Sequence, residues 1–192
     1  MDTEFDVINY EIGMFLSALI FYQKRMEKDC SDSVMENYIK NALAESLVLH
    51  IRVLTEIFMP GGREDDIKAV NVMKKWCDEH KLLIKNLHHA YEKVYVSELK
   101  GTSKTLIDKL LAHGTNKRGD MFDWSPVIRT MEPPLIEILR TLSKEEFPAL
   151  NLLSHIEDCE TKETPVFSTH TPSSAVINRW VHPDDRETPT HK

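Results

Sequence analysis

The sequence is poor in glycine and in cysteine. It has only 6 glycines and 3 cysteines among its 192 residues. Turn-rich β proteins and disordered chains use more glycine, so this composition favours a soluble helical protein. Cys30, Cys77 and Cys159 form no Cys-x-x-Cys pair, and their odd number does not suit a framework of disulfides. We therefore expect a reducing, cytoplasmic environment.

The chain also lacks a long uninterrupted hydrophobic run. The run MFLSALIFY at 14–22 is bounded by Glu11 and Lys24. It is far shorter than the roughly 20 apolar residues that cross a bilayer. The N-terminus carries Asp2, Glu4 and Asp6, whereas a secretory signal begins with basic residues. The sequence therefore predicts no membrane partner.

Several functional motifs are missing. The chain contains no Gly-x-Gly-x-x-Gly, no phosphate-binding loop with Gly-Lys-Ser/Thr, and no Gly-x-Ser-x-Gly. Nucleotide hydrolysis and α/β-hydrolase chemistry therefore have no support, and we expect no cofactor. The net charge of -7 argues against general attraction to polyanions, although local basic patches are compatible with it.

Apolar residues recur at helical spacing along most of the chain. Ser33 and Glu36 have the spacing of a capping box, and Pro60 follows the helix that this box would open. Asp65 or Asp66 would cap the next helix. With these signals we predict helices over about 4–28, 34–59, 66–76, 77–99, 103–112 and 125–147, the last with a kink or restart at Pro133 and Pro134.

The predicted fold is all-α, an irregular bundle of four or five main helices. We expect one helical domain over residues 1–159 and a non-helical tail over 160–192 that is rich in Thr, Ser and Pro. If the tail docks, on its own chain or on a neighbouring one, its apolar residues would make the contact: Val166, Phe167, Val176, Ile177 and Trp180.

The second predicted helix raises the main functional question, because it is apolar yet carries several ionisable groups. A rotation of about 100° per residue puts Glu45, Arg52 and Glu56 in one stripe and His50 at the flank of the apolar side. In one interpretation the stripe is a solvated face on which Arg52 pairs with the two glutamates. In the other, Glu45, His50 and Arg52 enter a groove between helices that tunes their charge.

A second polar cluster lies in LLAHGTNKRGDMFDW at 110–124. His113 and Arg118 follow a predicted helix end, and Trp124 stands near the start of the next helix. Loops of this kind concentrate functional residues. Alternatively, His113 caps the last carbonyls of its helix and Arg118 is solvated.

These segments together resemble a family of largely uncharacterised bacterial all-helical proteins. The resemblance covers about residues 40–140 and rests on a Glu…His-x-Arg-x-Leu helix, an Asp-Asp turn, and an Ala-His…Arg segment followed by Trp. The matching positions are Glu45, His50, Arg52, Asp65, Asp66, His113, Arg118 and Trp124.

The architecture is also distantly similar to the HEPN superfamily, many of whose members are toxin or defence ribonucleases. Their motif has an arginine followed a few residues later by a histidine. Here the order is reversed, His113 before Arg118, and the usual order occurs only at Arg186 and His191 in the tail. This departure weakens the expectation of ribonuclease activity that the resemblance brings.

The enzymatic hypothesis is a metal-independent ribonuclease acting on RNA. His113 or His50 would be the acid or base, and Arg118 or Arg52 would stabilise charge on the phosphorane, with Glu45 in the same groove. Two-fold pairing of chains would supply further groups, so we expect a homo-oligomer, in the simplest case a dimer. No metal is expected, because Cys77, His80, His88 and His89 are too spread along one helix to form a site.

The alternative hypothesis is a non-enzymatic helical interaction protein. It would self-associate or bind a protein partner through the polar groove and the tail. In that case deletion of residues 160–192 would abolish the association, whereas the catalytic hypothesis predicts that RNA cleavage survives the deletion.

Overall fold

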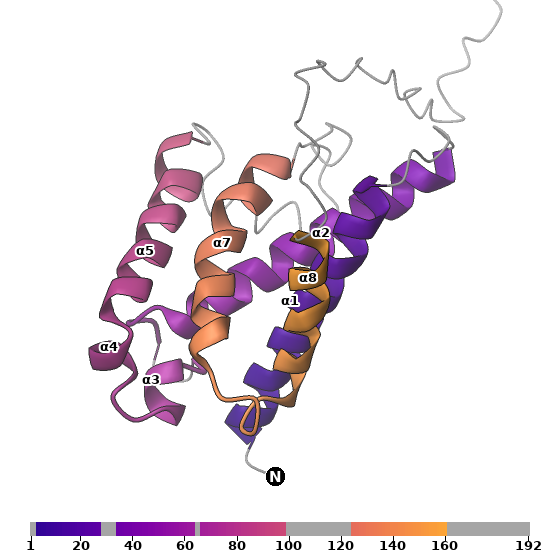
Figure 1. The fold of residues 1–192 in the computed structure, drawn as a ribbon. Coiled ribbons are helices and arrows are strands. Elements are labelled where there is room, and N and C mark those ends of the chain that lie inside the picture. Colours follow the sequence, from indigo (N-terminus) through magenta and orange to yellow (C-terminus); the bar gives the residue numbers. More distant parts are fainter. Residues whose placement is uncertain (1–2, 28–33, 64–65, 99–123, 161–192) are drawn as a thin grey trace, which may run out of the picture.

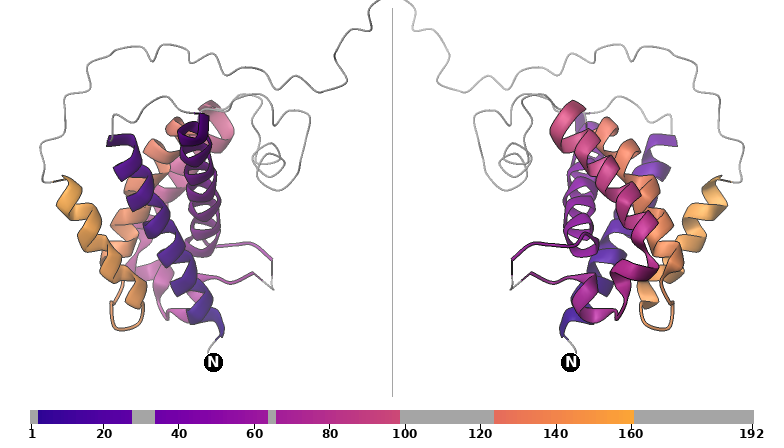
Figure 2. Two further views of the ribbon diagram at one scale, coloured as in Figure 1. Left: turned by 90° about the vertical axis from the view of Figure 1, so that its right-hand side faces the viewer. Right: turned by 90° about the vertical axis from the view of Figure 1, so that its left-hand side faces the viewer.

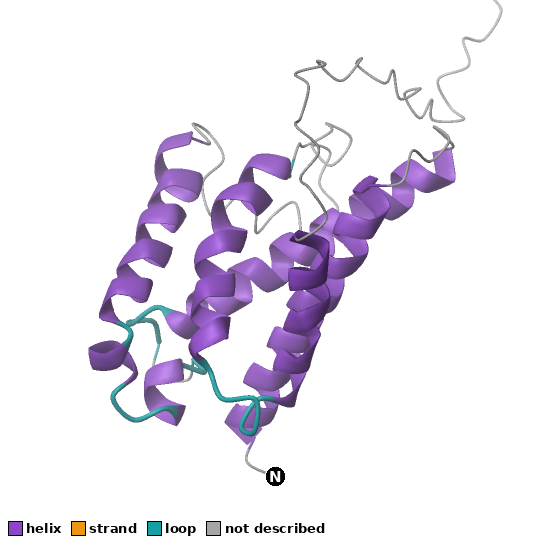
Figure 3. Ribbon diagram, in the orientation of Figure 1, coloured by secondary structure: helices purple, strands orange, loops and turns teal. Residues whose placement is uncertain are grey.

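The computed structural model describes residues 3–27, 34–63, 66–98 and 124–160 (Figure 1). Within these ranges the chain is helical and has no strand (Figure 3), so the predicted all-α fold class is confirmed. The longest elements described are the helices α1 (Thr3–Glu27), α2 (Val34–Phe58), α5 (Lys81–Glu92) and α7 (Ser125–Thr141). The bounds of α1 and α2 lie within one residue of the predicted ones.

The helices form two layers. α1 and α2 run antiparallel and pack on each other, and α5 and α7 form the second layer, with α7 against α2 (Figures 1 and 2). A 3-10 turn, η3 (Pro148–Leu152), and the helix α8 (Leu153–Glu160) lie along α1. One side of the α1 and α2 layer thus contacts the second layer, and the other side faces outward.

The core lies between the layers because each long helix repeats apolar residues at helical spacing. The buried side chains of α1 and α2 include Ile8, Ile12, Phe15, Leu16, Leu19, Leu47, Ile51, Leu54 and Phe58. The second layer contributes Ile84, Leu87, Val127, Met131, Leu135, Ile138 and Leu139. These are the positions that local periodicity marks as inward.

The predicted helix over 66–76 is wrong. The chain forms only two short helices here, α3 (Ala69–Val72) and α4 (Trp76–Glu79). The Asp66 carboxylate does not cap a helix, because it accepts the backbone N–H of Arg63 at 2.7 Å. Lys75 then takes a left-handed conformation with φ 65°, which interrupts the helix before α4. Asp65 lies outside the described residues.

The predicted helix over 77–99 is divided. α4 ends at Glu79, α5 begins at Lys81, and after Glu92 the chain continues as a π-helical segment, η1 (Lys93–Glu98). The junction at His80 has φ -110° and ψ 18°, outside the helical region. The helical pattern therefore places the element correctly but misses its breaks.

We expected a kink or a restart at Pro133 and Pro134, and α7 continues through both prolines without a restart. A proline cannot donate to the carbonyl four residues before it. Here Pro133 and Arg129 are both exposed, so water can satisfy the carbonyl that loses its donor. The buried stripe of α7 continues on both sides of the prolines and holds the helix on the core.

The last predicted helix ends early, at Thr141 instead of about 147. Leu142 is extended, and the chain turns back so that Phe147 is buried with its ring centroid 5.5 Å from that of Phe5. η3 and α8 follow and were not predicted. The predicted helix over 103–112 and residues 161–192 of the predicted tail lie outside the described residues.

Glu36, one member of the predicted capping box, binds a residue of the preceding helix. Its carboxylate accepts two hydrogen bonds from the Arg25 guanidinium, so it ties the end of α1 to the beginning of α2. Ser33, the other member of the predicted box, lies outside the described residues.

Candidate functional site

His50 on α2 faces α1. Its Nδ1 lies 2.7 Å from Glu11 Oε2, and the two side chains are only 9% and 15% exposed. A buried polar group is tolerated when it is hydrogen-bonded, and this contact supplies the bond for both residues. His50 therefore links the two helices of the first layer.

Arg52 lies on the other side of the same helix, because two residues correspond to a rotation of about 200°. Its Nε is 3.4 Å from Glu56 Oε1, the neighbour-turn pair that the solvated-face interpretation predicts. The structure therefore does not bring His50 and Arg52 into one recess. Glu45 is partly buried on α2.

His113 and Arg118, the other predicted site residues, lie outside the described residues, so their relation to α2 stays a prediction. Trp124 is described and lies directly before α7, where its side chain is buried in the core. Its sequence signal is accounted for by packing.

A surface cavity of about 490 Å³ lies at the C-terminal end of α2. Cationic and anionic side chains line it together, so its charges largely offset one another. Its lining consists of Arg52, Thr55, Glu56, Met59, Pro60, Gly61, Gly62, Arg63, Asp66, Lys68 and Tyr91. This mixture of charges is compatible with binding of an anionic ligand. It is equally compatible with ion pairs among the lining residues themselves.

Lys68 organises the wall of this cavity, which the sequence did not indicate. Its Nζ donates to the backbone carbonyl of Glu56 at 2.6 Å and lies 3.8 Å from Asp66 Oδ2. A cation at the C-terminal end of a helix also complements the helix dipole. Lys68 thus caps α2 from a distant turn, although lysine is normally a surface residue.

Trp76 and His80 make structural contacts in this region. Trp76 Nε1 donates to the Phe58 carbonyl at 3.0 Å. The Trp76 ring stacks on the His80 ring, with 4.2 Å between the ring centroids. A second surface cavity, of about 450 Å³, borders these two residues. Within the described ranges no three His, Cys, Asp or Glu side chains are grouped to hold a metal ion.

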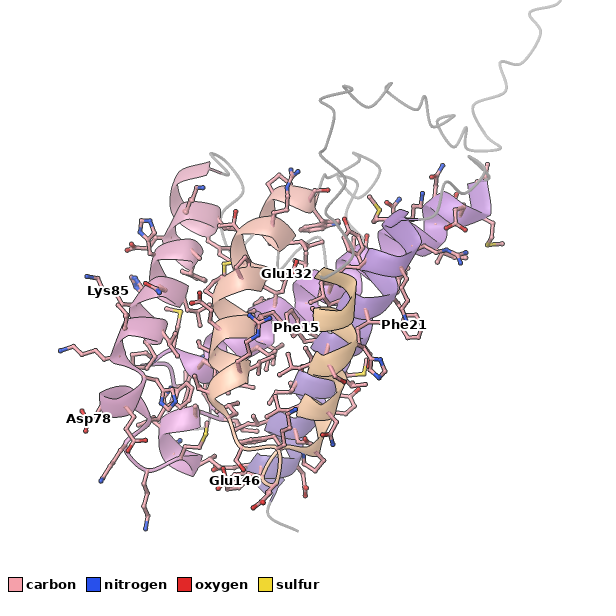
Figure 4. The ribbon with its side chains drawn as sticks, viewed as in Figure 1. Phe15, Phe21, Asp78, Lys85, Glu132 and Glu146 are labelled. Atoms are coloured by element: carbon pink, nitrogen blue, oxygen red, sulfur yellow. The ribbon has the colours of Figure 1, made fainter. Side chains whose placement is uncertain are left out.

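α1 carries apolar side chains on two opposite sides. Phe15 points into the bundle, whereas Phe21 projects outward (Figure 4) and is 60% exposed. Tyr10 is 59% exposed, and Val7 is exposed on the same side of the helix. On α2 the residues Val34, Met35, Tyr38 and Leu49 are also exposed. We call the residues Val7, Tyr10, Met14, Ser17 and Phe21 the outer face of α1.

By length and composition alone, α1 could cross a membrane between Glu4 and Met26, and 39% of that window is buried in the structure. The sequence interpretation counted only the uninterrupted run at 14–22. Because core helices of soluble proteins have the same character, the expectation of no membrane partner stays a prediction.

No protein-family model matches this chain, and no curated protein or solved structure is significantly similar to it.

Proposed function

We propose that this protein is a non-enzymatic helical interaction protein that self-associates. The observation that carries the proposal is the outer face of α1, which is apolar except for Ser17 and faces away from the core. A helix that serves only as one wall of a bundle needs a single apolar side. The second side is accounted for if it is covered by a partner.

The chemistry of the outer face suits a protein interface. Tyr10 and Phe21 are large aromatic side chains, a class that is enriched at interfaces because each buries much area with few rotatable bonds. Removing such a side chain from water contributes about 1.5–3 kcal/mol. Exposed apolar side chains that gather on one face mark interaction sites on soluble proteins, and this face carries three of them, Val7, Tyr10 and Phe21.

The test is light scattering on the full chain over a concentration series in the micromolar range, with Phe21→Glu compared with Leu82→Glu. Leu82 lies on α5 in the other layer and is 69% exposed, so it is a matched control for adding a charge to an exposed apolar site. We expect the unaltered protein and Leu82→Glu to associate equally and Phe21→Glu to shift to monomer, with helical circular dichroism unchanged.

A monomeric unaltered chain over the whole series contradicts self-association. Equal association of all three proteins contradicts the use of the outer face.

A metal-independent ribonuclease is the second candidate. The observation that favours it is the cavity at the end of α2, whose lining includes three cationic side chains that suit a phosphate, Arg52, Arg63 and Lys68. Arg52 would be the phosphate clamp. His50 is engaged with Glu11 on another side of α2, so the acid or base would be His113, with Arg118 as a further clamp.

The ribonuclease candidate is tested with purified protein and mixed RNA. We expect His113→Ala and Arg118→Ala each to abolish cleavage if this candidate is correct. Cleavage that neither substitution lowers removes the assignment, and lack of cleavage by the unaltered protein removes the candidate.

A further inference from the structure

We infer that a second copy of this chain docks on the outer face of α1, with the two α1 helices antiparallel and a two-fold axis near Met14. This inference rests on the proposed self-association and adds its interface and register. It makes α1 the shared element of two cores, one within the chain and one between chains.

The spacing of the outer face supports helix-on-helix packing. Its residues stand at 7, 10, 14, 17 and 21, alternating steps of three and four. This is the spacing of a seam between two helices. At about 100° per residue the seam is centred roughly opposite the stripe of Ile8, Ile12, Phe15 and Leu19 that forms the core.

The sizes of the side chains fit an antiparallel register. A two-fold axis near Met14 brings residues equally far from it on either side into register. Val7 of one copy then lies beside Phe21 of the other, and Tyr10 lies within one residue, about 1.5 Å, of the position opposite Ser17. Each pair joins a larger and a smaller side chain, which is how facing layers interdigitate.

The charges at the ends of the seam favour the same register. Asp6 and Lys24 are both exposed, and helical rotation puts them on the same flank of the outer face. In an antiparallel pair the same flanks of the two copies meet end to end, so Asp6 of one copy approaches Lys24 of the other. The two positions miss exact register by two residues, about 3 Å. A lysine side chain spans that offset.

A parallel pair, whose two-fold axis runs along the seam, would instead put the Asp6 and Lys24 flanks of the two copies on opposite sides of the seam, so neither attractive pair would form. The charge pattern therefore selects an antiparallel second copy over a parallel one. It also disfavours a bilayer as the occupant, because both charges border the apolar seam.

The described elements leave the outer face accessible. η3 approaches α1 on a different side, where Ala149 N donates to Asn9 Oδ1 at 3.0 Å. The left view of Figure 2 looks onto α1 and α2, with α5 and α7 behind them. η3 and α8 lie along one flank of α1 and α2 lies along the other, so a helix of the second copy would approach between these two flanks.

A single helix pair is a small interface, so we expect a monomer–dimer equilibrium in the micromolar range instead of a permanent dimer. Because the interface is small, the charges of Asp6 and Lys24 at its ends should change the dissociation constant measurably.

The first experiment exchanges those charges in the full chain. Asp6→Lys and Lys24→Asp each turn two attractive pairs into two repulsive ones, so each should raise the dissociation constant roughly 5- to 30-fold at low salt. The double variant restores both pairs with reversed sign and should recover association. Recovered association in the double variant indicates an ion pair between copies. An effect of the two charges on the helix dipole of α1 would not recover, because the double variant places both charges unfavourably for the dipole.

The second experiment places a cysteine at the inferred axis. Cys30, Cys77 and Cys159 are replaced by serine, and Met14→Cys is compared with Leu82→Cys under mild oxidation. A disulfide needs Cα atoms closer than about 7 Å, which only residues near the two-fold axis satisfy. We expect covalent dimers from Met14→Cys on a non-reducing gel and none from Leu82→Cys.

The outcomes distinguish the two proposals. In one outcome, Phe21→Glu abolishes association, neither charge variant weakens it, and Met14→Cys gives no covalent dimer. That outcome overturns the antiparallel register but not self-association. A full chain that is monomeric throughout overturns both. Sedimentation of a monomeric chain with phosphatidylcholine vesicles, lost in Phe21→Glu, assigns the outer face to a lipid surface and also overturns both.

Discussion

At the scale of single residues, the ionisable groups of α2 form two kinds of ion pair, one buried and one partly exposed. His50 is buried against Glu11, whereas Arg52 and Glu56 form a more exposed pair with side chains 25% and 42% exposed. Surface pairs contribute little, because water screens them and the side chains lose entropy. Buried pairs matter mainly because loss of one partner leaves the other uncompensated.

We therefore expect Glu11→Ala to lower the free energy of unfolding by about 2–4 kcal/mol, since it leaves His50 buried without its acceptor. The matched control Glu56→Ala should cost less than about 1 kcal/mol. The double variant Glu11→Leu/His50→Leu should regain most of the loss, because no polar group is then stranded. Urea denaturation of the variants measures all three values, and equal losses for Glu11→Ala and Glu56→Ala would contradict the buried-pair interpretation.

A second residue-scale prediction concerns the turn that carries Lys68. Gly61 and Gly62 both have positive φ, 89° and 116°. A Cβ on Gly62 would lie 2.5 Å from Asp66 Oδ2 and 2.7 Å from Lys68 Cε, whereas a Cβ on Gly61 meets nothing within 4 Å. Gly61→Ala should cost about 1 kcal/mol for its backbone conformation alone.

Gly62→Ala should cost about 1–2 kcal/mol more, because it also displaces Lys68 from the end of α2. Thermal or urea unfolding of the two variants gives the comparison. Equal costs would show that the Lys68 contact adds nothing to stability.

At the scale of elements, α7 shows how packing overrides local preference. Pro133 and Pro134 each remove a backbone donor, yet the helix is continuous because Leu135, Ile136 and Leu139 bury its inner side. The element is therefore kept by tertiary contacts at a local cost.

Pro133→Ala should raise the free energy of unfolding by about 1–3 kcal/mol, since alanine restores the missing donor at an exposed site. Pro126 is the matched control, because it stands in the first turn of α7, where proline is well tolerated. Pro126→Ala should change stability by less than about 0.5 kcal/mol. A destabilising Pro133→Ala measured by chemical denaturation would mean that the proline itself makes a needed contact.

At the scale of the whole molecule, the sequence interpretation and the proposal from the structure place association on different parts of the chain. The sequence interpretation assigned it to the polar groove and the tail, whereas the outer face of α1 lies in the first helix. Deletion of residues 161–192 should therefore leave the association constant within about twofold, because the seam is intact. Light scattering on the shortened chain checks this, and loss of association would return the interface to the tail.

The sequence predicted some contacts of the candidate functional residues and missed others. The helical pattern marked Arg52 and Glu56 as neighbours, and they are. It also put His50 at the flank of the apolar side, but it did not identify Glu11 as its partner. No local signal identified Lys68, because its acceptor is a backbone carbonyl twelve residues earlier. The outer face of α1 was present in the sequence as steps of three and four, hidden beside the stronger core pattern.

The sequence alone determined that the described chain is helical and where α1 and α2 begin and end, because apolar period and chain breakers act over a few residues. Only the tertiary structure decided which groups meet. Glu36 binds Arg25 of the preceding helix, and His50 turns to Glu11 and away from Arg52. These choices depend on how two helices are set against each other, and a periodic pattern within one helix does not contain that information.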